Sequence, residues 1–171
     1  MEKIDRGFIL PSAALTIKRS QVKFCEFKDK QPRVGDLVYG EIVRIGQHSS
    51  LENVSGRIHM IHDGTKAIFV FGNRYAPDYF EGLVPPEMER SADLLARSGV
   101  VGIVETKNAL IKDATKVRLT GYACDASGKV LNTLDFPLIQ PNRTNKRTPR
   151  AKMILVCCTS MNSGKSMAAA A

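Results

Sequence analysis

The sequence lacks both a long apolar segment and a secretory signal. No stretch approaches the roughly 18 uninterrupted apolar residues that a membrane-spanning helix needs, so we expect no membrane span. The first thirty residues carry charges of both signs, and their apolar stretch at 7–17 is broken by Pro11 and runs directly into Lys18 and Arg19. A signal peptide has a different order of charged and apolar regions. These absences predict a cytoplasmic protein that has no membrane partner.

Paired cysteine motifs are missing as well. The four cysteines lie at 25, 124, 157 and 158, which gives no CxxC spacing, and adjacent cysteines rarely bridge each other. A reducing compartment fits this pattern best. His59 and His62 are three residues apart in a predicted strand, so their side chains point to opposite faces and a shared metal would need a bulge. We therefore favour surface or half-buried histidines over a zinc site.

Acidic residues are absent between residues 142 and 152, where five cations gather. These cations are Arg143, Lys146, Arg147, Arg150 and Lys152. They account for most of the formal net charge of +8, so the rest of the protein is close to neutral and no broad basic face for nucleic acid is indicated. The segment is polar and contains Pro149, and we interpret 141–152 as a basic linker. Contact of its cations with phosphate is the alternative, but it has no aromatic residue to stack on bases, so nucleic acid is not an expected partner.

What the sequence does contain, up to about residue 135, is a series of short β patterns. Segments of alternating or continuous apolar residues are separated by turns rich in Gly, Pro and Asp. The predicted strands are 22–27, 37–45, 57–62, 67–71, 100–106, 116–123 and 129–134. Strands this short and this regularly spaced predict a mainly β fold, with a barrel- or sandwich-like domain over residues 1–140.

Three local signals refine this prediction. The turn residues at 63–65, Asp-Gly-Thr, predict a hairpin that joins 57–62 to 67–71. Gly40 lies inside a predicted strand and suggests a β-bulge. The one helix predicted in this domain is Glu87–Ser98, which follows two prolines and ends before Gly99.

Beyond the linker the pattern changes. Residues 153–158 form a continuous apolar run, typical of a strand buried on both faces of a parallel sheet, and an alanine-rich helix start follows at 167–171. The polar turn between them has the composition of a phosphate-binding loop, in which small residues let backbone N–H groups surround an anion. Lys165 would reach the β- and γ-phosphates, and the Ser166 hydroxyl would hold Mg²⁺. The predicted nucleotide-binding residues are Thr159, Ser160, Met161, Asn162, Ser163, Gly164, Lys165 and Ser166. The alternative is a serine-rich turn in which Lys165 is merely solvated.

The stretch 153–171 resembles the P-loop of the dethiobiotin synthetase and MobB-like group of NTPases. Their pattern runs Gly-Thr, four more residues, then Gly-Lys-Thr; here Thr159 and the Gly-Lys-Ser at 164–166 match, and Cys158 stands in place of the first glycine. The shorter pattern GxxxxGK[ST] would instead want glycine at 159. The resemblance implies that ATP or GTP binds with Mg²⁺. It also implies that 153–171 is the start of an α/β nucleotide-binding domain, truncated after its first strand and P-loop, with the rest in the full-length protein.

A second resemblance covers part of the β-rich region. The matching segments are Gly-Asp-Leu-Val at 35–38, Gly-Gln-His at 46–48, Phe-Gly-Asn-Arg-Tyr-Ala-Pro-Asp at 71–78 and Phe-Glu-Gly-Leu-Val-Pro at 80–85. They are similar to the β-domain that precedes such a P-loop in uncharacterised bacterial NTPase-like proteins. This resemblance implies no established activity.

Residues 72–81 are the most unusual part of the β-rich region, because they combine charged and aromatic residues where a strand enters a loop. Arg74, Tyr75, Asp78 and Tyr79 are candidates for a ligand or partner loop, with Arg74 binding an acid or phosphate and a tyrosine stacking. Alternatively, the aromatic rings fill the mouth of the domain and Arg74 pairs with Asp78 or Glu81. In both cases we expect the loop on an exposed rim, with Arg74 paired to a carboxylate when no ligand is bound.

Two functions remain open at this point. In the first, the chain is the N-terminal part of a cytosolic P-loop protein that depends on ATP or GTP, and these 171 residues alone are not expected to turn over nucleotide. Whether the protein is an enzyme is left undecided. In the second, the β-domain is a stand-alone adaptor for a protein or nucleic acid, and the tail is incidental.

Overall fold

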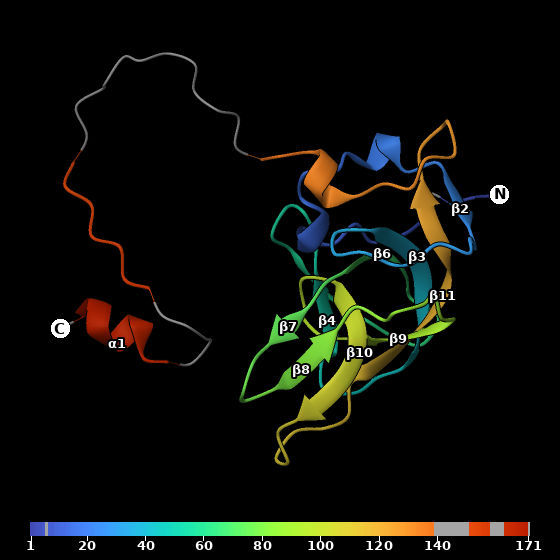
Figure 1. Cartoon of the computed structure of the whole chain (residues 1–171). Coiled ribbons are helices and arrows are strands. Elements are labelled where there is room, and N and C mark those ends of the chain that lie inside the picture. The colour runs from blue at the N-terminus through green and yellow to red at the C-terminus, as the bar shows by residue number, and fades with distance from the viewer. Residues whose placement is uncertain (6, 139–150, 158–162, 171) are drawn as a thin grey trace.

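A computed structural model describes residues 1–5, 7–138, 151–157 and 163–170 of the chain (Figure 1). The described residues are mainly β, as predicted, with one large sheet and a separate two-stranded sheet of β4 and β5. The strands are β1 (Glu2–Lys3), β2 (Phe24–Glu26), β3 (Leu37–Arg44), β4 (Ser50–Glu52), β5 (Ile58–Met60), β6 (Lys66–Phe71), β7 (Arg74–Tyr75), β8 (Phe80–Leu83), β9 (Ser91–Leu94), β10 (Val100–Lys107) and β11 (Thr115–Cys124). The short helices are η1 (Ser12–Ala14), η2 (Arg19–Gln21), η3 (Thr133–Asp135) and α1 (Lys165–Ala170).

The large sheet has the strand order β1-β2-β11-β3-β6-β10-β8-β7, and β9 pairs with both β10 and β11. Strands β3, β6, β10, β9 and β11 therefore form a closed ring of pairings, and Figure 1 shows them curving around a common interior. Within the ring only β6 and β10 run parallel; the other pairs are antiparallel. The closed path is compatible with the barrel-like alternative of the prediction.

Two apolar cores lie on opposite faces of β3 and β6. Val38 and Phe69 belong to the inner core, to which all five ring strands contribute. Their neighbours Leu37 and Ile68 point the other way, into an outer core that is covered by the N-terminal segment 4–22. Because both faces are covered, most of β3 and nearly all of β6 are buried, and their sequences are more continuously apolar than those of half-exposed strands.

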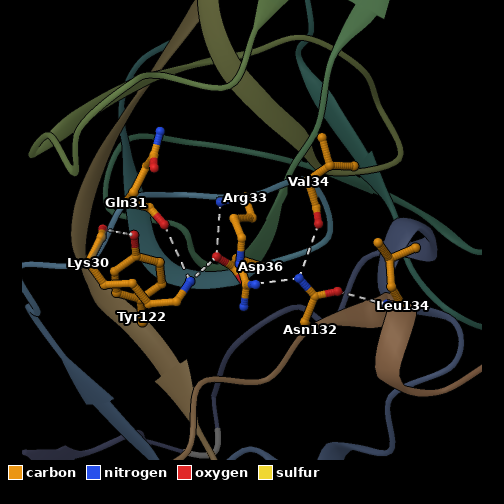
Figure 2. A network of polar contacts seen from close by, with 8 residues as sticks. All are labelled: Lys30, Gln31, Arg33, Val34, Asp36, Tyr122, Asn132 and Leu134. Carbon is orange, nitrogen blue, oxygen red and sulfur yellow. Dashed lines mark hydrogen bonds and ion pairs between the residues drawn. The ribbon is translucent and has the colours of Figure 1, made fainter.

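A buried polar cluster fixes the segment before β3 to the segment after β11 (Figure 2). The Asp36 side chain is 1% exposed, and it pairs with the Lys30 ammonium and accepts hydrogen bonds from the Arg33 backbone N–H at 3.0 Å and from Asn132 Nδ2 at 2.9 Å. The same Asn132 amide donates to the Val34 carbonyl at 3.1 Å. We call these residues the Asp36 cluster, and in it the buried carboxylate has a cation and two further donors.

Tyr122 extends the Asp36 cluster into the inner core. Its ring is fully buried, and its hydroxyl donates a hydrogen bond to the Lys30 carbonyl at 2.7 Å. The Lys30 ammonium lies 4.9 Å from the centre of the same ring. Burial, followed by the charge of Asp36, raises the pKa of Tyr122 to about 12. The phenol therefore stays neutral at physiological pH and can donate this hydrogen bond.

Several local predictions are wrong. Residues 87–98 do not form a helix; they contain β9, whose last three residues are buried between β10 and β11, so two strand partners override the helix-start signals. The turn at 62–65 does form, but it joins strands that do not pair with each other, because β5 pairs with β4 and β6 with β3. Residues 129–134 hold only isolated bridges and the start of η3, not a strand. The bulge lies opposite Gly40, at Thr120 of β11.

The predicted strand at 153–158 is not formed in its described part. Residues 153–157 have no regular structure, and Met153, Ile154 and Leu155 are more than 80% exposed. A strand of a parallel sheet needs neighbouring strands to take its hydrogen bonds, and no described strand pairs with this segment. Helix α1 follows where a helix start was predicted, although it begins two residues earlier, at Lys165. The domain boundary near residue 140 and most of the linker lie outside the described residues.

Candidate functional site

Half of the predicted phosphate loop lies in the described part of the chain. Thr159, Ser160, Met161 and Asn162 fall outside it, whereas Ser163, Gly164, Lys165 and Ser166 are described. Gly164 has a φ of 84°, in the left-handed region that glycine tolerates, and nothing within 4 Å would meet a side chain there. Helix α1 begins at the next residue, and the N–H of Ala168 donates to the Gly164 carbonyl at 3.0 Å.

The second candidate region, at 72–81, is a hairpin rather than a free loop. Strands β7 and β8 pair antiparallel, with Arg74 opposite Gly82 and Tyr75 opposite Glu81. The turn between them is closed by backbone hydrogen bonds from Ala76 to Phe80 and from Tyr79 to Ala76. Tyr75 is 59% exposed, whereas Phe80 is fully buried in a small third core. The hairpin therefore has one face on solvent and one face packed on the domain.

Arg74 does not pair with Asp78 or Glu81, so the predicted ion pair is wrong. Its Nη1 atom donates to the backbone carbonyl of Leu95 and lies 3.3 Å from Nε2 of His48. Its guanidinium carbon lies 5.7 Å from the centre of the Tyr79 ring. We call Arg74, His48, Tyr79 and the Leu95 carbonyl the Arg74 cluster.

The short β7–β8 hairpin explains the failed prediction. The side chains of Arg74 and Glu81 belong to positions that are not opposite each other in the register. Glu81 instead accepts a hydrogen bond from Thr106 of β10 at 3.1 Å. Arg74 meets the segment that follows β9, which is far away in the sequence and was predicted to be helical.

His48 reaches the cluster from the loop after β3. The buried Thr115 hydroxyl donates to the His48 carbonyl at 2.6 Å and accepts from the Gly46 N–H at 2.8 Å. A side chain at position 46 would come within 2.1 Å of the Asp113 carbonyl, so only glycine fits this close approach. The imidazole then stacks on the Tyr79 ring, at 5.9 Å between centroids and 6° between planes.

Burial and positive charge together disfavour the protonated form of His48. Burial is the main cause that lowers its pKa, and the charges of Arg74 and Arg97 lower it further, against the hydrogen bond to the Leu95 carbonyl. Its Nε2 lies 3.0 Å from that carbonyl, which fits a neutral ring that carries its proton on Nε2. Burial also lowers the pKa of Arg74. In the Arg74 cluster, a guanidinium and a neutral imidazole therefore both donate to one oxygen, the Leu95 carbonyl.

A surface pocket of about 200 Å³ adjoins the hairpin. Its lining residues come from the hairpin and from the end of β10, and they are Tyr75, Ala76, Pro77, Tyr79, Glu81, Thr106, Lys107 and Asn108. The backbone N–H of Asn108 donates to the Tyr79 carbonyl at 2.9 Å, which joins the two segments. Tyr79 is shared, because it lines this pocket and also contacts Arg74.

Sequence reasoning found Arg74 and Tyr79 but missed the role of His48. The residue was noted only within a matching segment of the β-rich region, and no local pattern placed it beside Arg74, which lies 26 positions further along the chain. Contact between them depends on the pairing of distant strands. Of the other histidines, His59 lies 3.0 Å from the Asn53 side chain. Among the described residues, no three His, Cys, Asp or Glu side chains gather in a way that could hold a metal ion.

No family model, no curated protein and no solved structure matches the chain. Within the described residues, no helix has the length and apolar character needed to cross a membrane.

Proposed function

We propose that this chain contributes the phosphate-binding loop of a cytosolic P-loop protein that binds ATP or GTP, with residues 159–166 around the phosphates. A barrel-like β-domain would precede the nucleotide site, separated from it by the basic linker at 141–152. The proposal rests on the order of residues at 163–166, Ser-Gly-Lys-Ser, between an apolar run and a helix. That order supplies a flexible turn, a cation and a hydroxyl in the sequence that phosphate binding needs.

The observation that supports the proposal best is the local conformation at Gly164 and Lys165. A positive φ at the glycine and a helix that begins at the lysine are what a loop of this kind requires before its helix. Ser166 lies in the first turn of α1, and its hydroxyl is the oxygen ligand type that Mg²⁺ accepts. When bound, Mg²⁺ would neutralise part of the charge on the β- and γ-phosphates.

Lys165→Ala is the direct test, carried out by titrating labelled ATP and GTP against the full-length protein. A charge-assisted contact to phosphate contributes about 1.5–3 kcal/mol, so we expect binding to weaken about ten- to a hundredfold. Lys152→Ala, at an exposed position in the described tail, is the matched control and should leave the affinity unchanged. Equal affinities for the wild type and Lys165→Ala would show that this loop is not the nucleotide site.

Two more variants test the roles within the loop. Ser166→Ala should weaken binding chiefly when Mg²⁺ is present, because the hydroxyl would serve the metal and not the phosphate. Thr159→Gly separates the two possible registers. Glycine should raise the affinity if the shorter pattern applies, and should not raise it if Thr159 already has a role in the longer one.

The alternative function is an adaptor role for the β-domain, with a protein or nucleic acid as partner. The half-exposed β7–β8 hairpin and the adjoining pocket favour it, because they present aromatic and charged groups on one rim of the domain. The two functions separate in a simple way. Nucleotide binding that depends on Lys165 supports the first, and a β-domain that binds its partner without residues 153–171 supports the second.

A further inference from the structure

Within the part of the chain that the structure describes, the Arg74 guanidinium has no negative partner. All seventeen acidic side chains of the chain lie among the described residues, and none of them forms an ion pair with Arg74. Arg74 donates to the Leu95 carbonyl and lies beside the His48 imidazole and the Tyr79 ring, none of which carries a negative charge. A half-buried cation without a counter-charge loses hydration and recovers only part of it from neutral groups.

The guanidinium still has donors to offer. The hydrogen bond to the protein is made by Nη1, and Nε and Nη2 carry three further N–H groups. No buried side-chain nitrogen or oxygen of the described residues lacks a hydrogen-bond partner, so Nε and Nη2, for which no hydrogen bond is formed, are not fully buried. They form the edge of the guanidinium that can bind two oxygens of one carboxylate or phosphate.

The same contacts hold this edge in a fixed orientation. The Leu95 carbonyl binds one end of the guanidinium, and the Tyr79 ring lies 5.7 Å from its carbon. Tyr79 is in turn stacked on His48, whose backbone is anchored by the buried Thr115. Because the arginine is already ordered, a ligand would lose less of its binding energy to the ordering of this side chain.

We propose that Arg74 binds an oxyanion, either a carboxylate or a phosphate, that belongs to a small ligand or to an extended partner on the β7–β8 rim. The Nε and Nη2 edge takes two of its oxygens. Tyr79, whose ring lies beside the guanidinium, also lines the neighbouring pocket, whereas Arg74 does not. This site belongs to the β-domain and does not depend on the phosphate loop proposed at 159–166.

The test observes the arginine directly by NMR. The Nε–H signal of Arg74, assigned by its loss in Arg74→Gln, is followed while inorganic phosphate or acetate is added at constant ionic strength. We expect a saturable shift in the wild type with at least one of the two anions. Resonances of the hairpin, including those of Tyr79, should move with the same dissociation constant. The anion that binds more tightly identifies the ligand class.

Four variants make the result specific. Arg74→Gln should abolish the saturable shifts of the hairpin. Arg74→Lys keeps the charge but cannot bind two oxygens in a bidentate way, so it should weaken binding by about tenfold or more. Arg57→Gln removes an exposed arginine elsewhere and should change nothing. Lys165→Ala should also change nothing, which separates this site from the nucleotide loop.

Two outcomes would overturn the proposal. One is a wild-type titration in which neither anion gives a saturable shift at Arg74. The other is binding that survives in Arg74→Gln while the backbone spectrum shows an intact fold. If Arg74→Gln does not fold, the wild-type titration and the Arg74→Lys variant still decide the question.

Discussion

The Asp36 cluster and the Arg74 cluster are both built around a charged side chain, and they differ in how that charge is matched. Asp36 is buried, and it has a lysine and two further donors on its oxygens. Asp93, the other buried carboxylate among the described residues, likewise has Lys116 at 2.7 Å and the Val104 N–H at 3.1 Å. Arg74 is half-buried and has no anionic partner among the residues that the structure describes.

The comparison separates a structural role from a binding role. A fully matched buried charge holds segments of the fold in place, and its loss should be felt in the free energy of unfolding. An ordered cation with unused donors contributes little to folding, but it is prepared for an anion from outside. The following predictions test this division, from the largest expected effect to the smallest.

Asp36→Ala should produce the largest loss of stability. It removes the acceptor for Lys30, the Arg33 N–H and Asn132, and leaves the buried Asn132 amide with one acceptor fewer. We expect the free energy of unfolding to fall by about 3 kcal/mol in urea titrations. The control is Asp135→Ala, which removes a surface pair with Lys129 and should cost less than about 1 kcal/mol. Equal losses for the two variants would contradict a special role for the Asp36 cluster.

Tyr122→Phe should have a smaller effect at neutral pH and a distinct effect at alkaline pH. The variant loses the hydrogen bond to the Lys30 carbonyl, which contributes about 1 kcal/mol. Because folding raises the pKa of Tyr122 from 10.0 to about 12, its contribution is complete below pH 10 and is lost as the pH rises toward 12. The stability of the wild type should therefore fall more steeply than that of Tyr122→Phe between pH 10 and 12. Parallel pH profiles would contradict the burial of a neutral phenol.

His48→Gln should alter the acid side of the same profile. Folding lowers the pKa of His48 below 6.5, so the neutral ring contributes stability above pH 6.5, and that contribution is lost as the pH falls through the lowered pKa. The variant should flatten this acid slope while it changes stability little at pH 8. His62→Gln, at an exposed histidine, is the control and should keep the slope. An unchanged slope in His48→Gln would contradict the desolvation of this imidazole.

The sequence predicts the longer strands of the fold, but it misses the short strands β1, β4, β7, β8 and β9, and it predicts strand partners poorly. Strands β3, β6, β10 and β11 were found from their apolar pattern, because continuous or alternating apolar residues depend mainly on burial. Strand β9 was missed because its short apolar stretch follows two prolines and looks like a helix start; only pairing with β10 and β11 makes it a strand.

At the candidate sites, too, the sequence identifies residues but not the distant residues that they contact. The unusual composition of residues 72–81 was enough to select Arg74 and Tyr79. The pairing of Arg74 with a nearby carboxylate was predicted from sequence distance and was wrong, because the hairpin register turns the arginine toward Leu95 and His48. Contacts of this kind depend on strands that meet across the ring, and a local pattern does not contain them.

The division between the two clusters can be tested most directly by the stabilisation that an anion confers on three proteins. The free energy of unfolding is measured for the wild type, Tyr122→Phe and Arg74→Gln, in phosphate and in acetate at tenfold the dissociation constant found by NMR. The wild type and Tyr122→Phe should both gain about 1.4 kcal/mol from the anion that binds, although Tyr122→Phe starts lower. Arg74→Gln should start within about 0.5 kcal/mol of the wild type and gain nothing beyond the general salt effect. An equal gain in Arg74→Gln, or a loss of the gain in Tyr122→Phe, would contradict the assignment of binding to one cluster and stability to the other.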